Sequence, residues 1–557
     1  MAQTARSPGD GDVTMQAATG RMKAHSDVVG PVLIVIALLL VAVVPLRSPR
    51  PEPVDAAASE FSAARAIDHV EEIAREPHAM GSVAIERVRD YLIDELEGLG
   101  LEPVLQTTRV PDYFGSDESV ELVNLMARIP GTDPTRAVAL MGHYDTEPTT
   151  PGANDNAAAV AAIVETARAL VDRPPLRNDV ILLFTDGEEP APRHGASAFV
   201  AEHPWLDDIG VIVNFEAVGG SGTSLLIETS DPDAWLVGEA SKAAPDLAAF
   251  SFITSLVDLL GGADTDFAPF RTHGTRGLGF AYLQGSPIYH TEFDTVDRVS
   301  HASLQHHGSL ALSLSRHFGD LDLDRDPTDG RATYFSIAGL TIRYPEPWAV
   351  PLGFLVLLAF GVAAARRIRA GHTSPNSLVR GAGVTTVAVL VGSVVAGLGW
   401  WALTAMRPMP STTESFVYLA GLLVLAAAVP VAMVRLAERS HRTDRSGGAV
   451  LVWVVLTVLA ALTLPSASYL FMWPALAGSL VLVWNATSPW QRAIRFAMVA
   501  APAVILSVPA VYFLFELAQP RPGNPDSEIV AVVILPILLA LLVAVLARAG
   551  WTRDDQR

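Results

Sequence analysis

Long apolar segments constrain this chain more than any other feature of its sequence. A helix needs about 20 apolar residues to cross the hydrocarbon core of a bilayer. One such segment precedes a long polar region and seven follow it; the eight lie at 28–46, 348–365, 381–404, 415–434, 448–464, 468–485, 495–517 and 528–547. The sequence therefore predicts an integral membrane protein, with a transmembrane anchor at 28–46 and an all-α, seven-span domain over 348–547.

Positive charges between the apolar segments predict how the chain is oriented, because cytoplasmic loops carry an excess of Arg and Lys. The N-terminal tail and alternate loops share most of these charges; they are Arg6, Arg21, Lys23, Arg366, Arg367, Arg369, Arg380, Arg435, Arg439, Arg442, Arg445, Arg492, Arg495, Arg548, Arg553 and Arg557. The short loops on the other side hold only Arg407 and Arg521. We therefore expect cytoplasmic tails at 1–27 and 548–557 and an extracytoplasmic region at 56–344.

The first apolar segment is interpreted as an uncleaved anchor. It is longer than the apolar part of a typical signal peptide, and no small-x-small cleavage site follows it. A cleaved signal peptide is the alternative. Lys23 and Lys242 are the only lysines, and this preference for Arg is associated with GC-rich genomes, so the expected location is a bacterial plasma membrane.

The region 56–344 has the pattern of an α/β domain. Its runs AVALMGHYD, DVILLFTDG and GVIVNFEAVG are apolar over most of their length, as in strands of a parallel sheet that is covered on both faces. Helical stretches such as NAAAVAAIVETARALV alternate with these runs. We expect a mixed, mostly parallel sheet between helices.

Composition excludes several classes of chemistry. The chain has no cysteine, which rules out disulfides, thiolate metal sites, iron–sulfur clusters and thiol catalysis. Any metal must then be bound by His, Asp and Glu. The formal net charge of -20 argues against a nucleic-acid partner, because proteins that bind nucleic acid carry a basic surface.

Side chains that can bind metals follow the predicted strands. The strand ends read GHYD (142–145), DGEE (186–189) and NFE (214–216), the loop GANDN (152–156) precedes a helix, and YHTEFD (289–294) comes much later. Each motif alone has an ordinary explanation, such as a polar turn, a helix cap or a solvated loop. Glu216 is different, since a carboxylate after the apolar run VIVNF is costly to bury without a cation. Because sites form at the carboxyl ends of parallel strands, the motifs together predict a metal site.

These motifs resemble those of the co-catalytic zinc exopeptidases related to aminopeptidase Y and glutamate carboxypeptidase II. They are most similar to the membrane-embedded branch, which includes endoplasmic-reticulum metallopeptidases and fungal vacuolar membrane proteases. The matching elements are PHAMGS (77–82), GHYDT, GANDNAAAV, FTDGEEP, NFEAVG, ADTDFAPF and IYHTEFDT, and they cover about residues 60–310. Members of that branch also have one span, a lumenal peptidase domain and a multi-span tail, in the order predicted here.

The resemblance implies a peptidase with two zinc ions and a role for each ligand. Asp155 would bridge both ions. Glu189 and His290 would complete the protein ligands of one ion, and His143 and Glu216 would complete those of the other.

The resemblance also implies how the water is activated. Glu188 would be the general base and no ligand, and Asp145 would orient the imidazole of His143. The family has a cis peptide bond after the bridging Asp, which would fall at Asp155–Asn156. Three protein ligands per zinc ion leave room for water, and two ions about 3.5–4 Å apart can share a hydroxide and polarise a peptide carbonyl. Cobalt or manganese would suit the same ligands.

Two positions depart from the family pattern. The sequence PAPRHG (190–195) follows the Glu pair where many relatives have a Gly-Leu type loop, which indicates a different substrate-facing rim. Glu216 stands where many soluble members carry Asp, and this leaves open how tightly the second ion is bound.

The sequence favours an aminopeptidase, with peptides as substrates and the lipid bilayer as a partner, and it carries no signal for an oligomeric state. An aminopeptidase needs carboxylates for the substrate's ammonium group, and Asp264 and Asp266 are candidates, with loop capping as the alternative. A carboxypeptidase would need Arg for the terminal carboxylate; Arg193, Arg271 and Arg276 are available.

Two other functions remain open. A glutaminyl cyclase of the same fold would use one zinc ion, and the ligands alone do not exclude it. A transporter or receptor would use the exported domain only for binding. Ion-coupled transport usually places ionisable groups inside the helix bundle, whereas these segments lack charges at mid-depth and Glu516 lies near the outer end of its span.

Overall fold

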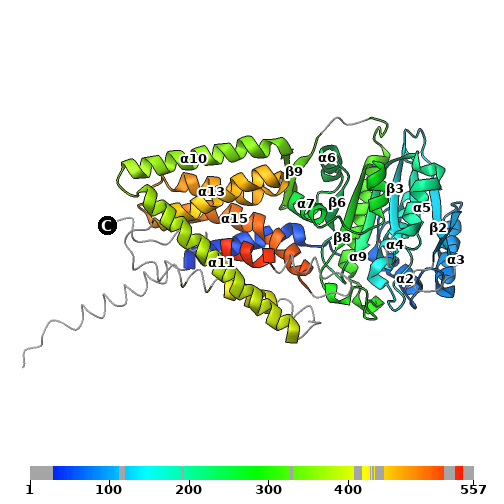
Figure 1. Cartoon of the computed structure of the whole chain (residues 1–557). Coiled ribbons are helices and arrows are strands. Elements are labelled where there is room, and N and C mark those ends of the chain that lie inside the picture. The colour runs from blue at the N-terminus through cyan, green and yellow to red at the C-terminus, as the bar shows by residue number, and fades with distance from the viewer. Residues whose placement is uncertain are drawn as a thin grey trace, which may run out of the picture.

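The computed structural model describes residues 29–111, 119–189, 193–325, 330–406, 417–426, 428, 432, 444–519 and 533–542. Within these residues an α/β domain lies beside a region of long helices (Figure 1). This arrangement confirms the predicted fold class, a mixed sheet between helices joined to an all-α region.

An eight-stranded sheet forms the centre of the α/β domain, with the strand order β1-β2-β4-β3-β5-β8-β6-β7. The neighbours β4, β3, β5 and β8 run parallel to one another, whereas β1, β2 and β6 add antiparallel pairs at the two sides. The strands are β1 Val104–Pro111, β2 Ser119–Ile129, β3 Ala137–His143, β4 Val180–Thr185, β5 Ile209–Ala217, β6 Leu225–Thr229, β7 Ala248–Ala249 and β8 Gly277–Tyr282.

Helices cover both faces of this sheet. One face packs against α2 (Ala63–Ile73), α4 (Ala159–Val171), α6 (Ala234–Ala243) and α9 (His301–Gly319), with α3 (Val83–Gly98) adding to the same hydrophobic cluster. The other face packs against α5 (His194–Glu202) and α8 (Phe267–His273). In β3, Val138 and Leu140 belong to the first cluster and Ala139 and Met141 to the second, because side chains alternate along a strand. Burial on both faces explains why these strands are apolar almost throughout.

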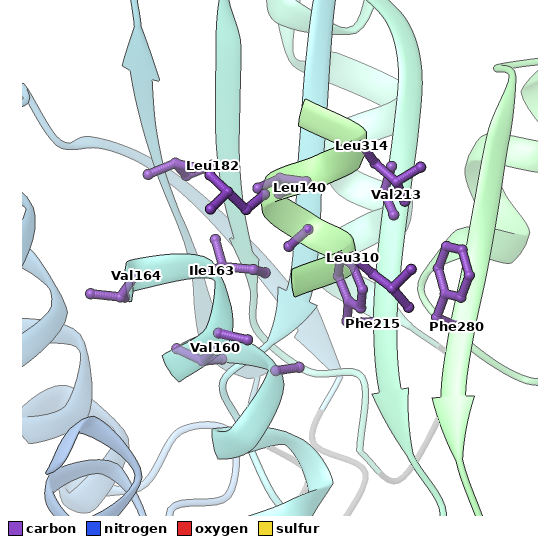
Figure 2. Packing of buried hydrophobic residues seen from close by; sticks show 14 of the residues in the cluster. Leu140, Val160, Ile163, Val164, Leu182, Val213, Phe215, Phe280, Leu310 and Leu314 are labelled. Atoms are coloured by element: carbon purple, nitrogen blue, oxygen red, sulfur yellow. The ribbon is translucent and has the colours of Figure 1, made fainter. Parts of the chain in front are cut away.

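The packing in Figure 2 fixes the strands that carry the predicted site. Side chains of α4 and α9 meet side chains of β3, β4, β5 and β8; those labelled are Leu140, Val160, Ile163, Val164, Leu182, Val213, Phe215, Phe280, Leu310 and Leu314. Burying one such side chain contributes about 1.5–3 kcal/mol. The strand ends are therefore held by a rigid core directly beneath them.

The helical region consists mainly of apolar helices. It contains α10 (Ala349–Arg369), α11 (Pro375–Met406), α13 (Arg445–Thr463), α14 (Tyr469–Val481) and α15 (Pro489–Leu517), and the hairpin of β9 (Ala332–Ile337) and β10 (Leu340–Pro345) precedes it. Of the described residues, four helices are long and apolar enough to cross a membrane: Glu346–Arg369, Pro375–Leu403, Ser446–Thr463 and Pro489–Leu517. Shorter apolar helices cover Val29–Ala42, Val417–Ala426, Tyr469–Val481 and Val533–Leu542.

Each of these helices overlaps one of the eight predicted segments, yet the number of spans and the domain limits stay predictions. Parts of the segments at 28–46, 415–434 and 528–547, and the predicted tails at 1–27 and 548–557, lie outside the described residues. The segment at 468–485 forms the 13-residue helix α14. At 1.5 Å per residue this helix is about 20 Å long, less than the roughly 30 Å of a bilayer core.

Candidate metal centre

The site residues predicted from sequence come together at the carboxyl ends of the parallel strands. His143 ends β3, Glu216 lies near the end of β5, and Glu188 and Glu189 follow β4. Asp155 lies at a kink in the segment Ala153–Ala158 before α4, where its backbone is not helical, and His290 follows β8. Three groups of residues could each hold a metal ion, because within each group the ligand atoms lie within 4.8 Å of one another. The groups are His143/Asp155/Glu216, His143/Glu188/Glu189 and Glu147/Glu189/His290.

Asp155 lies between the two histidines. Its Oδ1 is 3.3 Å from Nε2 of His143, and its Oδ2 is 3.3 Å from Nε2 of His290. A Glu approaches the same nitrogen of each imidazole: Oε2 of Glu216 lies 3.5 Å from His143 Nε2, and Oε1 of Glu189 lies 2.6 Å from His290 Nε2. One carboxylate thus joins two similar His and Glu pairs.

Burial differs across the site. The side chain of His143 is 1% exposed, whereas that of His290 is 18% exposed. Glu147 lies beside His290, with its Oε1 3.8 Å from Nδ1 of His290 and its side chain 25% exposed. Solvent therefore reaches the cluster from the side of His290 and Glu147. The sequence did not mark Glu147, because a single Glu in a polar loop has no distinctive pattern.

Asp145 holds the turn that carries the Glu pair. Its carboxylate accepts hydrogen bonds from the backbone N–H of Glu188 at 3.2 Å and of Glu189 at 2.9 Å. Nδ1 of His143 lies 3.1 Å from the backbone oxygen of Asp145 and 3.5 Å from its Oδ1. Asp145 is fully buried; its carboxylate holds the Glu pair, and its backbone oxygen and carboxylate both face the imidazole of His143.

Three further polar residues support the candidate ligands, and sequence reasoning missed their roles. The carboxylate of Asp294 accepts hydrogen bonds from the backbone N–H groups of Asn154 and Asp155 and from the Asn154 amide. The side-chain amides of Asn156 and Asn214 each donate to one carboxylate oxygen of Glu216, both at 2.9 Å. Asn156 and Asp294 lie in motifs that the sequence had marked, and Asn214 carried a signal of its own, since an amide in a buried strand needs a partner. The peptide bond Asp155–Asn156 is cis, as the resemblance implied.

The pKa values reflect the crowding of buried charges. Although burial raises the pKa of Asp155, hydrogen bonds from His143 and His290 outweigh it and lower this pKa to about 2. Burial lowers the pKa of His290, but hydrogen bonds to Asp155 and Glu189 raise it to about 10. Burial raises the pKa of Glu189 to about 7, and burial with repulsion from Glu189 raises that of Glu188 well above its usual value.

The residues present fit a zinc site. The cluster is acidic, most of its members are buried, and its donors are imidazole nitrogens and carboxylate oxygens, which zinc prefers when no cysteine is available. Hydrogen bonds from backbone and amide groups orient Asp145 and Glu216, as is usual around metal ligands. A divalent cation would also balance the negative charge of the cluster.

The remaining candidates from the sequence lie away from this cluster or are engaged elsewhere. Asp264 is exposed and forms an ion pair with Arg193. Asp266 is buried and accepts a hydrogen bond from the Thr185 hydroxyl. Arg271 pairs with Asp258 at 2.6 Å, and Arg276 donates to the backbone oxygens of Leu323 and Arg325.

Comparisons with known proteins agree with this chemistry. Residues 124–315 match the family described as peptidase family M28. The endoplasmic reticulum metallopeptidase 1 of Rattus norvegicus is 27% identical over 318 residues, covering 52% of this chain and 35% of the relative. The vacuolar membrane protease of Candida dubliniensis is 28% identical over 306 residues, covering 53% and 32%. The matched region thus spans about a third of the length of these curated relatives.

Solved structures were also matched. A zinc aminopeptidase from Bacillus subtilis, 15% identical, has a TM-score of 0.37 and covers 45% of this chain and 94% of that one. A glutaminyl cyclase from an Acidobacteriales bacterium, 20% identical, has a TM-score of 0.38 and covers 48% and 98%. On the family match, the cluster of His, Asp and Glu and the apolar helices, this chain carries a metallopeptidase domain of peptidase family M28, joined to a membrane-associated helical region.

Proposed function

We propose that this chain is a membrane-anchored, two-zinc exopeptidase, and specifically an aminopeptidase. The position of Asp155 carries the proposal, because its two carboxylate oxygens each lie 3.3 Å from a different histidine. A ligand shared by two ions needs this arrangement. Asp155 and Glu189 with His290 would hold one ion, and Asp155 and Glu216 with His143 the other. Zinc bound there would activate a water molecule and polarise the scissile carbonyl.

We assign the general base to Glu188. Its carboxylate belongs to the same cluster as His143 and Glu189, and the turn that carries it is held by Asp145. Glu188 would take a proton from the attacking water and return it to the leaving amine. Asp145 would act only through its neighbours, as a positioning residue for His143 and for the Glu pair.

The proposed preference for a free N-terminus rests on a carboxylate at the side of the site that solvent reaches. Glu147 is a partly exposed carboxylate next to His290, so it is available to an ammonium group. We propose it in place of Asp264, whose carboxylate pairs with Arg193, and of Asp266, whose carboxylate is buried. Among the Arg residues considered for a carboxypeptidase, Arg193 is neutralised by the same pair.

A peptide panel tests this specificity on the purified full-length protein. We expect stepwise release of residues from the N-terminus, loss of at least about 100-fold in kcat/KM on N-acetylation, and little change on C-terminal amidation, because the site would hold the ammonium group. If amidation blocks hydrolysis and acetylation does not, the enzyme is a carboxypeptidase. Conversion of a Gln peptide to pyroglutamate without hydrolysis identifies a glutaminyl cyclase.

We also propose that both termini are cytoplasmic and that the α/β domain lies outside the cytoplasm of a bacterium. The chain lacks cysteine, so an introduced cysteine reports its side of the membrane without background. A membrane-impermeant maleimide should label Asp207→Cys in the α/β domain on intact cells. His372→Cys, between α10 and α11, should be labelled only after the cells are permeabilised. Labelling in the opposite order would overturn this topology.

A further inference from the structure

The helical region meets the α/β domain next to two loops that adjoin candidate metal ligands. Buried residues from both parts form one hydrophobic cluster, with Leu225 and Leu283 on one side and Leu514 of α15 on the other. Figure 1 shows the contact at the side of the sheet where β6 and β8 lie. Glu216 near the end of β5 precedes one loop at this contact (218–224), and β8 precedes the other (283–290), which ends in His290.

The last turn of α15 holds the second loop through Glu516. The backbone N–H of Gly285 donates to Oε2 of Glu516 at 3.4 Å, and the Ser286 hydroxyl donates to the Glu516 backbone oxygen at 3.2 Å. The last carbonyls of a helix have no partner within the helix, so a serine hydroxyl that contacts one of them fixes the loop to the helix end. Glu516 is only 3% exposed, which keeps water away from these contacts.

Tyr512, one turn earlier in α15, lies against the first loop. A Cβ atom on Gly222 would lie 2.7 Å from the Tyr512 hydroxyl oxygen, so a side chain has no room there. The two loops are also joined, because Ser221 and Gln284 exchange backbone hydrogen bonds of 3.0 and 2.9 Å. The end of α15 therefore supports both loops as one unit.

His290 depends on this support. Its backbone has φ = 56°, in the left-handed region, which costs a non-glycine residue about 1 kcal/mol or more and persists only where the surroundings hold it. Its imidazole stacks on the ring of Tyr289, with centroids 3.7 Å apart. Between this pair and Gly285 lies only the short helical turn Ser286–Ile288.

We propose that Glu516 is a positioning residue for the metal centre, through which α15 fixes the loop 283–290 and so the place of His290. The helical region is then a working part of the peptidase as well as its anchor. This inference rests on the proposed function for its consequence, weaker zinc binding when the contact is lost. The contact itself predicts that loop amides exchange more slowly in the wild type than in a variant without the Glu516 carboxylate, even in metal-free protein.

The experiment compares full-length wild type, Glu516→Ala and Glu516→Gln in detergent. In metal-free Glu516→Ala, hydrogen exchange at Gly285–His290 should become about five- to tenfold faster, as expected for one lost hydrogen bond. Its affinity for the ion held by His290 should fall about 10-fold, with activity restored by excess zinc. Glu516→Gln keeps an acceptor oxygen and should stay close to wild type.

Thr457→Ala is the matched control, because it removes a buried hydroxyl that bonds only within its own helix α13 in the described structure. It should leave both exchange at 283–290 and zinc affinity unchanged. Unchanged exchange in Glu516→Ala, or an equal change in Thr457→Ala, overturns the inference. If the wild type binds no zinc, the proposed function fails instead, and the exchange measurement still decides whether α15 holds the loop.

Discussion

Glu188→Gln should keep the zinc content of the wild type and lose about 10²- to 10⁴-fold in kcat. Gln has nearly the same shape as Glu, so the buried turn that Asp145 holds through the Glu188 N–H should survive. The amide cannot take a proton from water, however, and the step that forms the nucleophile fails. Zinc analysis and peptide hydrolysis on the same preparation measure both properties.

The neighbouring carboxylate supplies the contrast for this experiment. Glu189, whose Oε1 lies 2.6 Å from Nε2 of His290, is proposed to bind one zinc ion. Glu188 is proposed to bind none. Glu189→Gln, the same chemical change one residue along the chain, should therefore lower zinc content as well as activity. Two results would contradict the assignment: more than about a tenth of wild-type activity in Glu188→Gln, or equal loss of zinc in both variants.

That the candidate site residues lie close together could be predicted, because their proximity follows from the direction of the strands. His143 and the Glu pair come after neighbouring parallel strands, whose carboxyl ends necessarily share one edge. Apolar runs marked these strands, since burial on both faces leaves no polar alternation to interpret. The antiparallel strands at the sides of the sheet carry no such signal, and β7, with two residues, is too short for one.

The hydrogen bonds that support the candidate ligands could not be predicted, because they depend on contacts between distant parts of the chain. Asp294 bonds Asn154 across 140 residues, and Asn156 bonds Glu216 across 60. Each is a polar residue whose partner is known only once the fold is known. Glu516 belongs to the same class: its place in an apolar segment was visible, but its contact with Gly285 spans 231 residues.

Helix ends in the helical region differ from the apolar segments for a local reason. The segment predicted at 495–517 begins at Pro489 in the structure. Ser488 caps the helix, and the side-chain oxygen of Gln491 accepts a hydrogen bond from the backbone N–H of Ser488, so the polar residues before the apolar run are included. Hydropathy locates the apolar part of such a helix, whereas the capping residues set where it starts.

Chelation of zinc should abolish hydrolysis and lower the midpoint of thermal unfolding, and added zinc should restore both. The physical reason is the buried cluster, in which carboxylates lie within 4.8 Å of one another and gain from a cation that only the folded chain can hold. At 100 times its Kd, zinc should add about 2.7 kcal/mol, which corresponds to a rise of roughly 5 °C or more for a domain of this size.

Asp155→Asn should lose this response to zinc and stay inactive when zinc is restored. An amide presents one oxygen and one NH₂ group, so it cannot direct an oxygen toward both His143 and His290. Glu228→Gln is the matched control: Glu228 is a buried carboxylate on β6 that bonds Thr265 and belongs to none of the ligand groups. It should retain the zinc-dependent rise in midpoint. If Asp155→Asn is stabilised by zinc as much as the wild type, Asp155 does not bridge two ions, and the two-zinc mechanism is wrong.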